Sequence, residues 1–145
     1  MKKIILYYSI TALAFFLHSA TYAQKKEKDK LLAGKVFEAE FTVQNKKAKP
    51  VKDEIIFKSE KISVKFISEK TGFTDNPYTA SVDSSSGSTV IRFESEGKNK
   101  DNEVIKWKGT VTKEIIGGTA TITDKKGKTK TEYFFSGNLK STKKK

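Results

Sequence analysis

The residues that proteins most often use for catalysis and metal binding are scarce in this chain of 145 residues. It contains no Cys, and its single histidine, His18, lies in the N-terminal segment. Disulfides, thiolate nucleophiles and zinc–thiolate sites are therefore excluded. Asp53 and Glu54 are neighbours that point to opposite faces of a predicted strand, whereas Glu94 and Glu96 share a face expected to be solvated. We therefore predict a protein that is not an enzyme and has no cofactor and no metal.

Arg92 is the only arginine in the sequence. Its planar guanidinium group suits bidentate capture of a carboxylate or a phosphate. The alternation of the surrounding residues places it on the face opposite Ile91 and Phe93, beside Glu94. A surface ion pair is the simpler interpretation of this position.

Two aromatic residues, Trp107 and Phe135, each precede a glycine by two positions and therefore share a strand face with it. An aromatic ring beside bare backbone can form a stacking floor for a sugar or an apolar ligand. The alternative, which we favour, is that the glycine makes room for a ring from a neighbouring strand.

The N-terminal segment has the three-part pattern of a secretory signal peptide. Residues 1–3 (MKK) are positive, residues 4–17 form a largely apolar run, and Thr21 and Ala23 supply small side chains at the −3 and −1 positions. The apolar run is shorter than the roughly 20 residues that span a bilayer, although an uncleaved N-terminal anchor is an alternative. We expect cleavage before Gln24 and export to the periplasm or the cell exterior.

The protein is strongly basic, with 29 Lys and Arg against 17 Asp and Glu and a formal net charge of +12. The excess is lysine, spread over loops, outer strand faces and both termini, and it lacks the arginines and aromatics that nucleic-acid modules place on one face. We predict a monomer that has no nucleic-acid partner and makes weak contact with an anionic envelope surface or polysaccharide. A charged surface that only maintains solubility is the alternative.

Apolar and polar residues alternate through most of the chain after residue 36, which is typical of half-buried strands. The expected strands are 37–43, 55–57, 62–66, 78–82, 89–95, 105–111, 116–122 and 133–139. Because mostly short turns join them, we predict an all-β, antiparallel, eight-stranded up-and-down meander. Closure into a barrel would remove its two open edges, and an open twisted sheet or a two-sheet sandwich is the alternative. Any helix in this part should be short.

Four parts follow from this organisation of the 145 residues. They are a signal peptide (1–23), a flexible basic leader (24–33), a β-barrel domain (34–140) and a disordered Lys-rich tail (141–145).

Three segments, 107–111 (WKGTV), 116–120 (IGGTA) and 133–139 (YFFSGNL), resemble the closing strands of small secreted bacterial lipocalin-like (calycin-type) domains. Gly72-Phe73 and Tyr78 fit the same resemblance, which covers most of residues 34–140. Lipocalins carry Gly-x-Trp on the first strand, where this chain has Gly34-Lys35-Val36-Phe37. The resemblance implies a small eight-stranded barrel.

An eight-stranded barrel is either filled by side chains or holds one small ligand. We therefore expect an exported, non-enzymatic lipocalin-like domain that binds a small apolar or amphiphilic ligand. The inward aromatic residues that would line its cavity are Phe57, Phe66, Tyr78, Phe93, Trp107 and Tyr133. The alternative is a structural or interaction protein that has a solid core and uses its basic surface on anionic envelope components.

Overall fold

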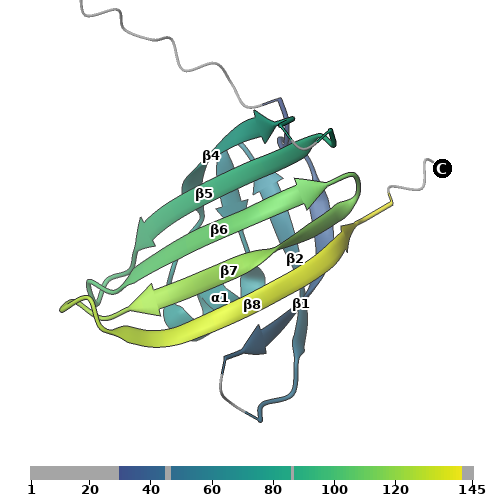
Figure 1. The fold of residues 1–145 in the computed structure, drawn as a ribbon. Helices are drawn as coiled ribbons and strands as arrows, with labels where there is room; N and C mark the ends of the chain where they lie inside the picture. The colour runs from purple at the N-terminus through teal and green to yellow at the C-terminus, as the bar shows by residue number, and fades with distance from the viewer. Residues whose placement is uncertain (1–29, 45–46, 86, 142–145) are drawn as a thin grey trace, which may run out of the picture.

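The fold is a closed barrel of eight antiparallel strands, each paired with its neighbours in chain order (Figure 1). The computed structural model describes residues 30–44, 47–85 and 87–141, so the expected signal peptide, most of the leader and most of the tail lie outside the described residues. The strands are β1 (Val36–Val43), β2 (Val51–Lys58), β3 (Lys61–Ser63), β4 (Asn76–Asp83), β5 (Val90–Lys98), β6 (Val104–Thr112), β7 (Ile115–Thr123) and β8 (Thr129–Leu139). A short helix, α1 (Lys65–Thr71), joins β3 to β4. The all-β, up-and-down prediction is confirmed.

The barrel closes because the first and last strands pair with each other. β1 and β8 are antiparallel, in a register that runs from Phe37 opposite Leu139 to Val43 opposite Tyr133. The backbone groups of both strands are therefore used in pairing, which removes the exposed edges that an open sheet would have. This pairing rules out the open sheet and the sandwich.

The strand faces follow the predicted alternation. On β6, Ile105 and Trp107 are buried, whereas Lys106 and Lys108 are exposed. Burial on one side and solvent on the other fixes the phase of a strand, because side chains alternate with a period of two.

The predicted strand 62–66 is wrong in its second half. Strand β3 ends at Ser63, and α1 begins at Lys65, so Phe66 is a helical residue and not a strand residue. Its side chain still reaches the core, because it packs against the buried cluster from α1.

Two local interactions explain why the chain turns into a helix here. Asp53 on β2 accepts a hydrogen bond from the backbone N–H of Phe66, with 2.7 Å between N and Oδ2. This bond satisfies one of the N–H groups that a helix leaves free at its start. At the other end, Gly72 adopts a left-handed conformation (φ 71°) and donates its N–H to the carbonyl of Ser68 at 2.9 Å. Glycine tolerates that conformation and so ends the helix.

The packed domain begins earlier than the expected boundary at residue 34. Leu32 is fully buried and Leu31 packs against the core. The backbone N–H of Gly34 donates to the carbonyl of Phe57 at 2.7 Å. The flexible leader predicted for residues 24–33 therefore does not extend through Leu31 and Leu32.

Candidate functional site

The structure places the predicted site residues in the interior of the barrel. Phe57, Tyr78, Phe93, Trp107 and Tyr133 are buried, each no more than 6% exposed. Phe66 is the exception, since it is only partly buried and comes from α1. The alternation therefore found the inward positions, and the next question is whether the rings surround a space or fill it.

The rings contact one another directly. Phe57 lies edge-on to Tyr78 and to Phe93, with ring centroids 4.9 and 5.1 Å apart. Phe66 lies edge-on to Tyr133 at 5.7 Å. These separations are those of favourable aromatic pairs, so the rings pack on each other and leave no gap of ligand width between these partners.

Phe41 and Phe135, which the predicted set of site residues omits, join these pairs into one network. Phe41 contacts Phe66 at 4.9 Å and Trp107 at 6.4 Å. Phe135 contacts Trp107 at 5.7 Å and Phe93 at 6.4 Å. Both residues occupy inward positions in strands whose apolar and polar residues alternate, so the sequence pattern could have identified them.

Atoms of neighbouring residues occupy the space beside the inward glycines. A Cβ atom on Gly109 would lie 2.4 Å from Cζ of Phe93, so this glycine makes room for the ring of an adjacent strand, as the sequence interpretation favours. At Gly137 the neighbour is backbone, because a Cβ atom would lie 2.2 Å from the carbonyl oxygen of Glu38. Neither glycine opens a stacking floor.

One unusual polar atom lies in the core. Nε1 of Trp107 is buried and has no hydrogen-bond partner among the described residues. Trp107 lines a hollow of about 10 Å³ between the barrel and the segment that contains α1, together with Ile67, Phe73 and Asn76. A hollow of this size is about that of one water molecule and is far below the 300 Å³ or more of typical ligand pockets, taken as order-of-magnitude values.

Arg92 forms the expected surface ion pair, with Asp83 and not with Glu94. Its Nη2 lies 3.0 Å and its Nε 3.1 Å from Oδ2 of Asp83. Hydrogen bonds from Ser85, followed by those from Arg92, lower the pKa of Asp83 to about 2. Glu94 pairs instead with Lys108, at 3.8 Å. The guanidinium group is therefore already occupied.

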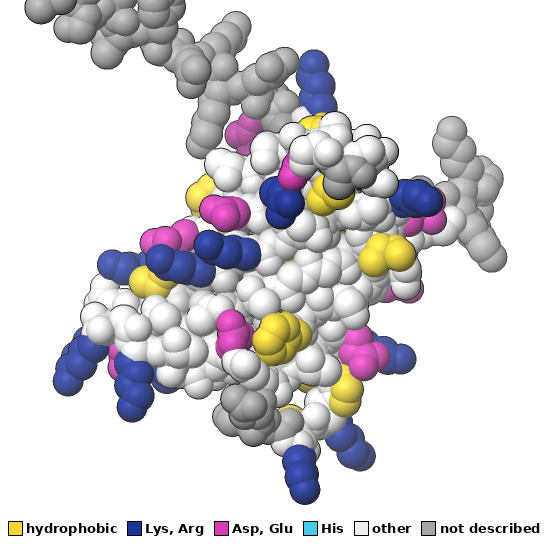
Figure 2. Space-filling view, viewed as in Figure 1, with side chains coloured by type: hydrophobic (Ala, Val, Ile, Leu, Met, Phe, Trp, Pro, Cys, Tyr) yellow, Lys and Arg dark blue, Asp and Glu magenta, His cyan; other side chains and the backbone are white. Residues whose placement is uncertain are grey.

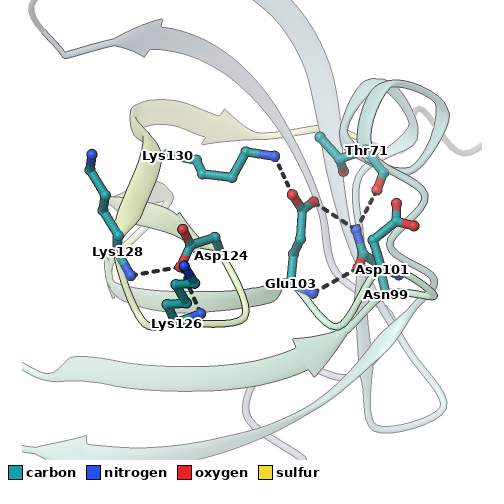
Figure 3. Close-up of polar contacts among 8 residues, drawn as sticks. All are labelled: Thr71, Asn99, Asp101, Glu103, Asp124, Lys126, Lys128 and Lys130. Carbon is teal, nitrogen blue, oxygen red and sulfur yellow. Dashed lines mark hydrogen bonds and ion pairs between the residues drawn. The ribbon is translucent and has the colours of Figure 1, made fainter.

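The hairpins β5–β6 and β7–β8 meet at the end of the barrel where α1 lies (Figure 3). Asn99 donates from Nδ2 to the carbonyl oxygen of Thr71 and to Oε2 of Glu103, both at 2.9 Å. Glu103 also pairs with Lys130 of β8. Hydrogen bonds from Lys130 and then from Asn99 lower the pKa of Glu103. The hydrogen bond to Glu103 raises the pKa of Lys130. These contacts hold the two hairpins and the end of α1 together.

Lysines crowd this braced end of the molecule. In Figure 2 dark-blue side chains project at the lower left, where the β5–β6 and β7–β8 hairpins lie in Figure 1. The carboxylate of Asp124 is turned inward, because it accepts hydrogen bonds from the backbone N–H groups of Lys126 at 2.8 Å and Lys128 at 2.9 Å. These bonds, that from Lys128 first, lower the pKa of Asp124. We call this surface the basic hairpin end; its lysines are Lys98, Lys100, Lys125, Lys126, Lys128 and Lys130.

Among the described residues, no group of three or more His, Cys, Asp or Glu side chains could hold a metal ion. The helix in the described part of the chain is too short to cross a membrane. The chain matches no protein-family model, no curated protein and no solved structure.

Proposed function

We propose that this protein is an exported, non-enzymatic interaction protein that uses the basic hairpin end to contact anionic polymers of the cell envelope. The observation that carries the proposal is the charge balance of the two hairpins. Residues 98–103 and 124–130 contain six lysines and three carboxylates, and two of those carboxylates, Glu103 and Asp124, are held by hydrogen bonds within the hairpins.

Five of these lysines form no ion pair within the described residues, whereas Lys130 is bound to Glu103. Their side chains are exposed on the two hairpins, which the Glu103–Lys130 ion pair joins. Like charges on a fixed scaffold create a local positive potential that attracts polyanions. The packed aromatic interior supports the same proposal, since a solid core directs interactions to the surface.

The closed eight-stranded barrel, with its strands in chain order, supports the resemblance to small lipocalin-like domains. We infer that the protein shares their architecture, with an interior occupied by its own aromatic side chains. Export by an N-terminal signal peptide and a monomeric state belong to this proposal.

Binding to dextran sulfate tests the proposal. A variant with Lys125, Lys126 and Lys128 all changed to Gln should bind about tenfold to a hundredfold more weakly, since a lysine near an anionic surface contributes on the order of 1 kcal/mol. Binding of the unchanged protein should fade as ionic strength rises beyond about 0.15 M, where the Debye length is roughly 8 Å. Isothermal titration calorimetry at low and high salt measures both effects.

The matched control changes the same number of charges at the opposite end of the barrel, at Lys58, Lys61 and Lys113. This control variant should bind within about twofold of the unchanged protein at 0.15 M salt, because screening limits the reach of exposed charges. Equal losses in the two variants would contradict a localised site and leave only a general effect of net charge.

A second candidate function, binding of a small apolar or amphiphilic ligand, is favoured by the unpartnered Nε1 of Trp107. A buried N–H without an acceptor costs about 1–3 kcal/mol, which an acceptor on a ligand head group would recover. Entry would require α1 to move away from the barrel end, enlarging the small hollow beside Trp107.

Fluorescence of Trp107, the only tryptophan, tests this candidate. Titration with fatty acids or haem should change its emission saturably, because a concave apolar site holds few molecules. The change should persist at high salt, since screening scarcely affects a buried apolar contact. No change with any of these ligands would exclude an interior site.

A further inference from the structure

A trough with polar and apolar walls lies on the outer surface of the barrel, away from the basic hairpin end. One hollow of about 710 Å³ lies over β1, β2 and β8. A second, of about 390 Å³, lies over β7, β8 and β1. Both are lined by Glu40 and Ser136, so they join there. We call this joined surface the outer trough.

Cross-strand pairing explains the low floor of the trough. Gly117 on β7 is opposite Ser136 on β8, and Ser136 is opposite Glu40 on β1. On β6, Thr110 is opposite Gly117. A glycine and a serine in the middle of this row leave the backbone nearly bare, while larger side chains rise on both sides.

The apolar walls of the trough are exposed to an unusual degree. Among the described residues four large hydrophobic side chains are exposed, and two of them, Ile115 at 60% and Phe134 at 42%, line the trough. Phe134 lies between Thr119 on one neighbouring strand and Thr42 on the other. Its ring is therefore flanked by hydroxyl groups, on a face of the molecule that Figure 2 shows to be largely uncharged over β7.

The polar walls are acidic on balance, because the larger hollow is lined by four carboxylates and one lysine: Glu38, Glu40, Asp53, Glu54 and Lys52. Lys140 forms ion pairs with Glu38 and Glu54. Glu40 has no ion pair or hydrogen bond with another described side chain, and Lys52 is its cross-strand neighbour on β2. The carboxylate of Glu40 is therefore available as a hydrogen-bond acceptor, and the excess of carboxylates disfavours an anionic polymer.

We propose that the outer trough binds a neutral oligosaccharide. Sugars present apolar C–H faces edged by hydroxyl groups, which matches an exposed aromatic ring with hydroxyls and a free carboxylate beside it. In the bound state a sugar ring stacks on Phe134, and its hydroxyls donate to Glu40 and exchange hydrogen bonds with Ser136. The open shape suits a chain that passes through, and a peptide strand has no barrel edge to pair with.

A panel of neutral hexasaccharides with glucose, mannose or N-acetylglucosamine units tests this proposal by isothermal titration calorimetry. At least one of them should bind in the micromolar to millimolar range, as is usual for an open and partly polar site. Phe134→Ala should weaken that binding about tenfold, through loss of the stacking surface. Glu40→Gln should weaken it by a smaller factor of about threefold, because the amide still offers one acceptor.

Two matched controls distinguish the trough from general surface effects. Val82→Ala removes another exposed hydrophobic side chain, and Glu94→Gln removes another outer carboxylate; neither residue lines the trough. Both variants should bind like the unchanged protein. The binding should also be independent of salt and leave Trp107 emission unchanged, unlike dextran sulfate binding or an interior ligand. A panel in which nothing binds, or equal losses in Phe134→Ala and Val82→Ala, would overturn the proposal.

Discussion

Replacing Trp107 with Ala is expected to lower the free energy of unfolding by about 3–5 kcal/mol, the usual cost of truncating a large buried ring. Trp107 is 3% exposed. It contacts Phe135 with ring centroids 5.7 Å apart and Phe41 at 6.4 Å. Truncation would leave a cavity among stiff aromatic neighbours that cannot close it. Urea denaturation, followed by far-ultraviolet circular dichroism because the fluorophore is lost, measures the effect.

Lys106→Ala is the matched control on the opposite face of the same strand. The side chain of Lys106 is 55% exposed, and its ion pair with Glu96 spans 3.3 Å. Exposed pairs contribute little, so the expected cost is about 0.5 kcal/mol or less. Equal losses of stability for the two substitutions would contradict the assignment of Trp107 to the inward face of β6 and of Lys106 to its outward face.

A third variant, Trp107→Phe, separates packing from the unpartnered N–H group. Phenylalanine keeps an aromatic ring in the core and removes the buried donor of Trp107. The cost should therefore fall well below that of Ala, because deleting an unsatisfied polar atom returns its desolvation penalty.

The phase of strands such as β6 could be predicted from sequence, because it depends only on local alternation. Ile105, Trp107 and Val111 are buried as the pattern requires. Pairing of β1 with β8 also follows, because the first and last strands of a meander would otherwise leave their backbone N–H and C=O groups unpaired.

Helix α1 could not be predicted in the same way. Ile62, Val64 and Phe66 continue an apolar alternation across the boundary between β3 and α1. The bond that supports the start of the helix comes from Asp53, a residue 13 positions earlier on another strand. A contact of this kind exists only after β2 and α1 have come together.

The outer trough escaped prediction for a related reason. The residues where its two hollows join, Ser136 and Glu40, come from β8 and β1 and depend on the register of these strands. Register between distant strands is set by the assembled core and is not visible in any one segment. The aromatic interior, in contrast, needs only the inward phase of each strand.

The second large effect concerns two neighbouring glycines on β7. A Cβ atom on Gly118 would lie 2.2 Å from the carbonyl oxygen of Lys108 and 2.6 Å from Cα of Gly109, both backbone atoms of β6. Backbone inside a paired sheet cannot move aside without breaking its ladder. Gly118→Ala should therefore destabilise the barrel by about 3 kcal/mol, at the upper end of the usual cost of overpacking.

Gly117→Ala provides the comparison one residue away. The nearest atom to its Cβ would be the carbonyl oxygen of Phe135, at 3.6 Å, which is an ordinary contact. Alanine also restricts the unfolded chain more than glycine does, so this variant should be neutral or stabilised by up to about 1 kcal/mol. Midpoints of urea unfolding compare the two variants, and similar losses in both would contradict the close approach of β6 and β7 at Gly118.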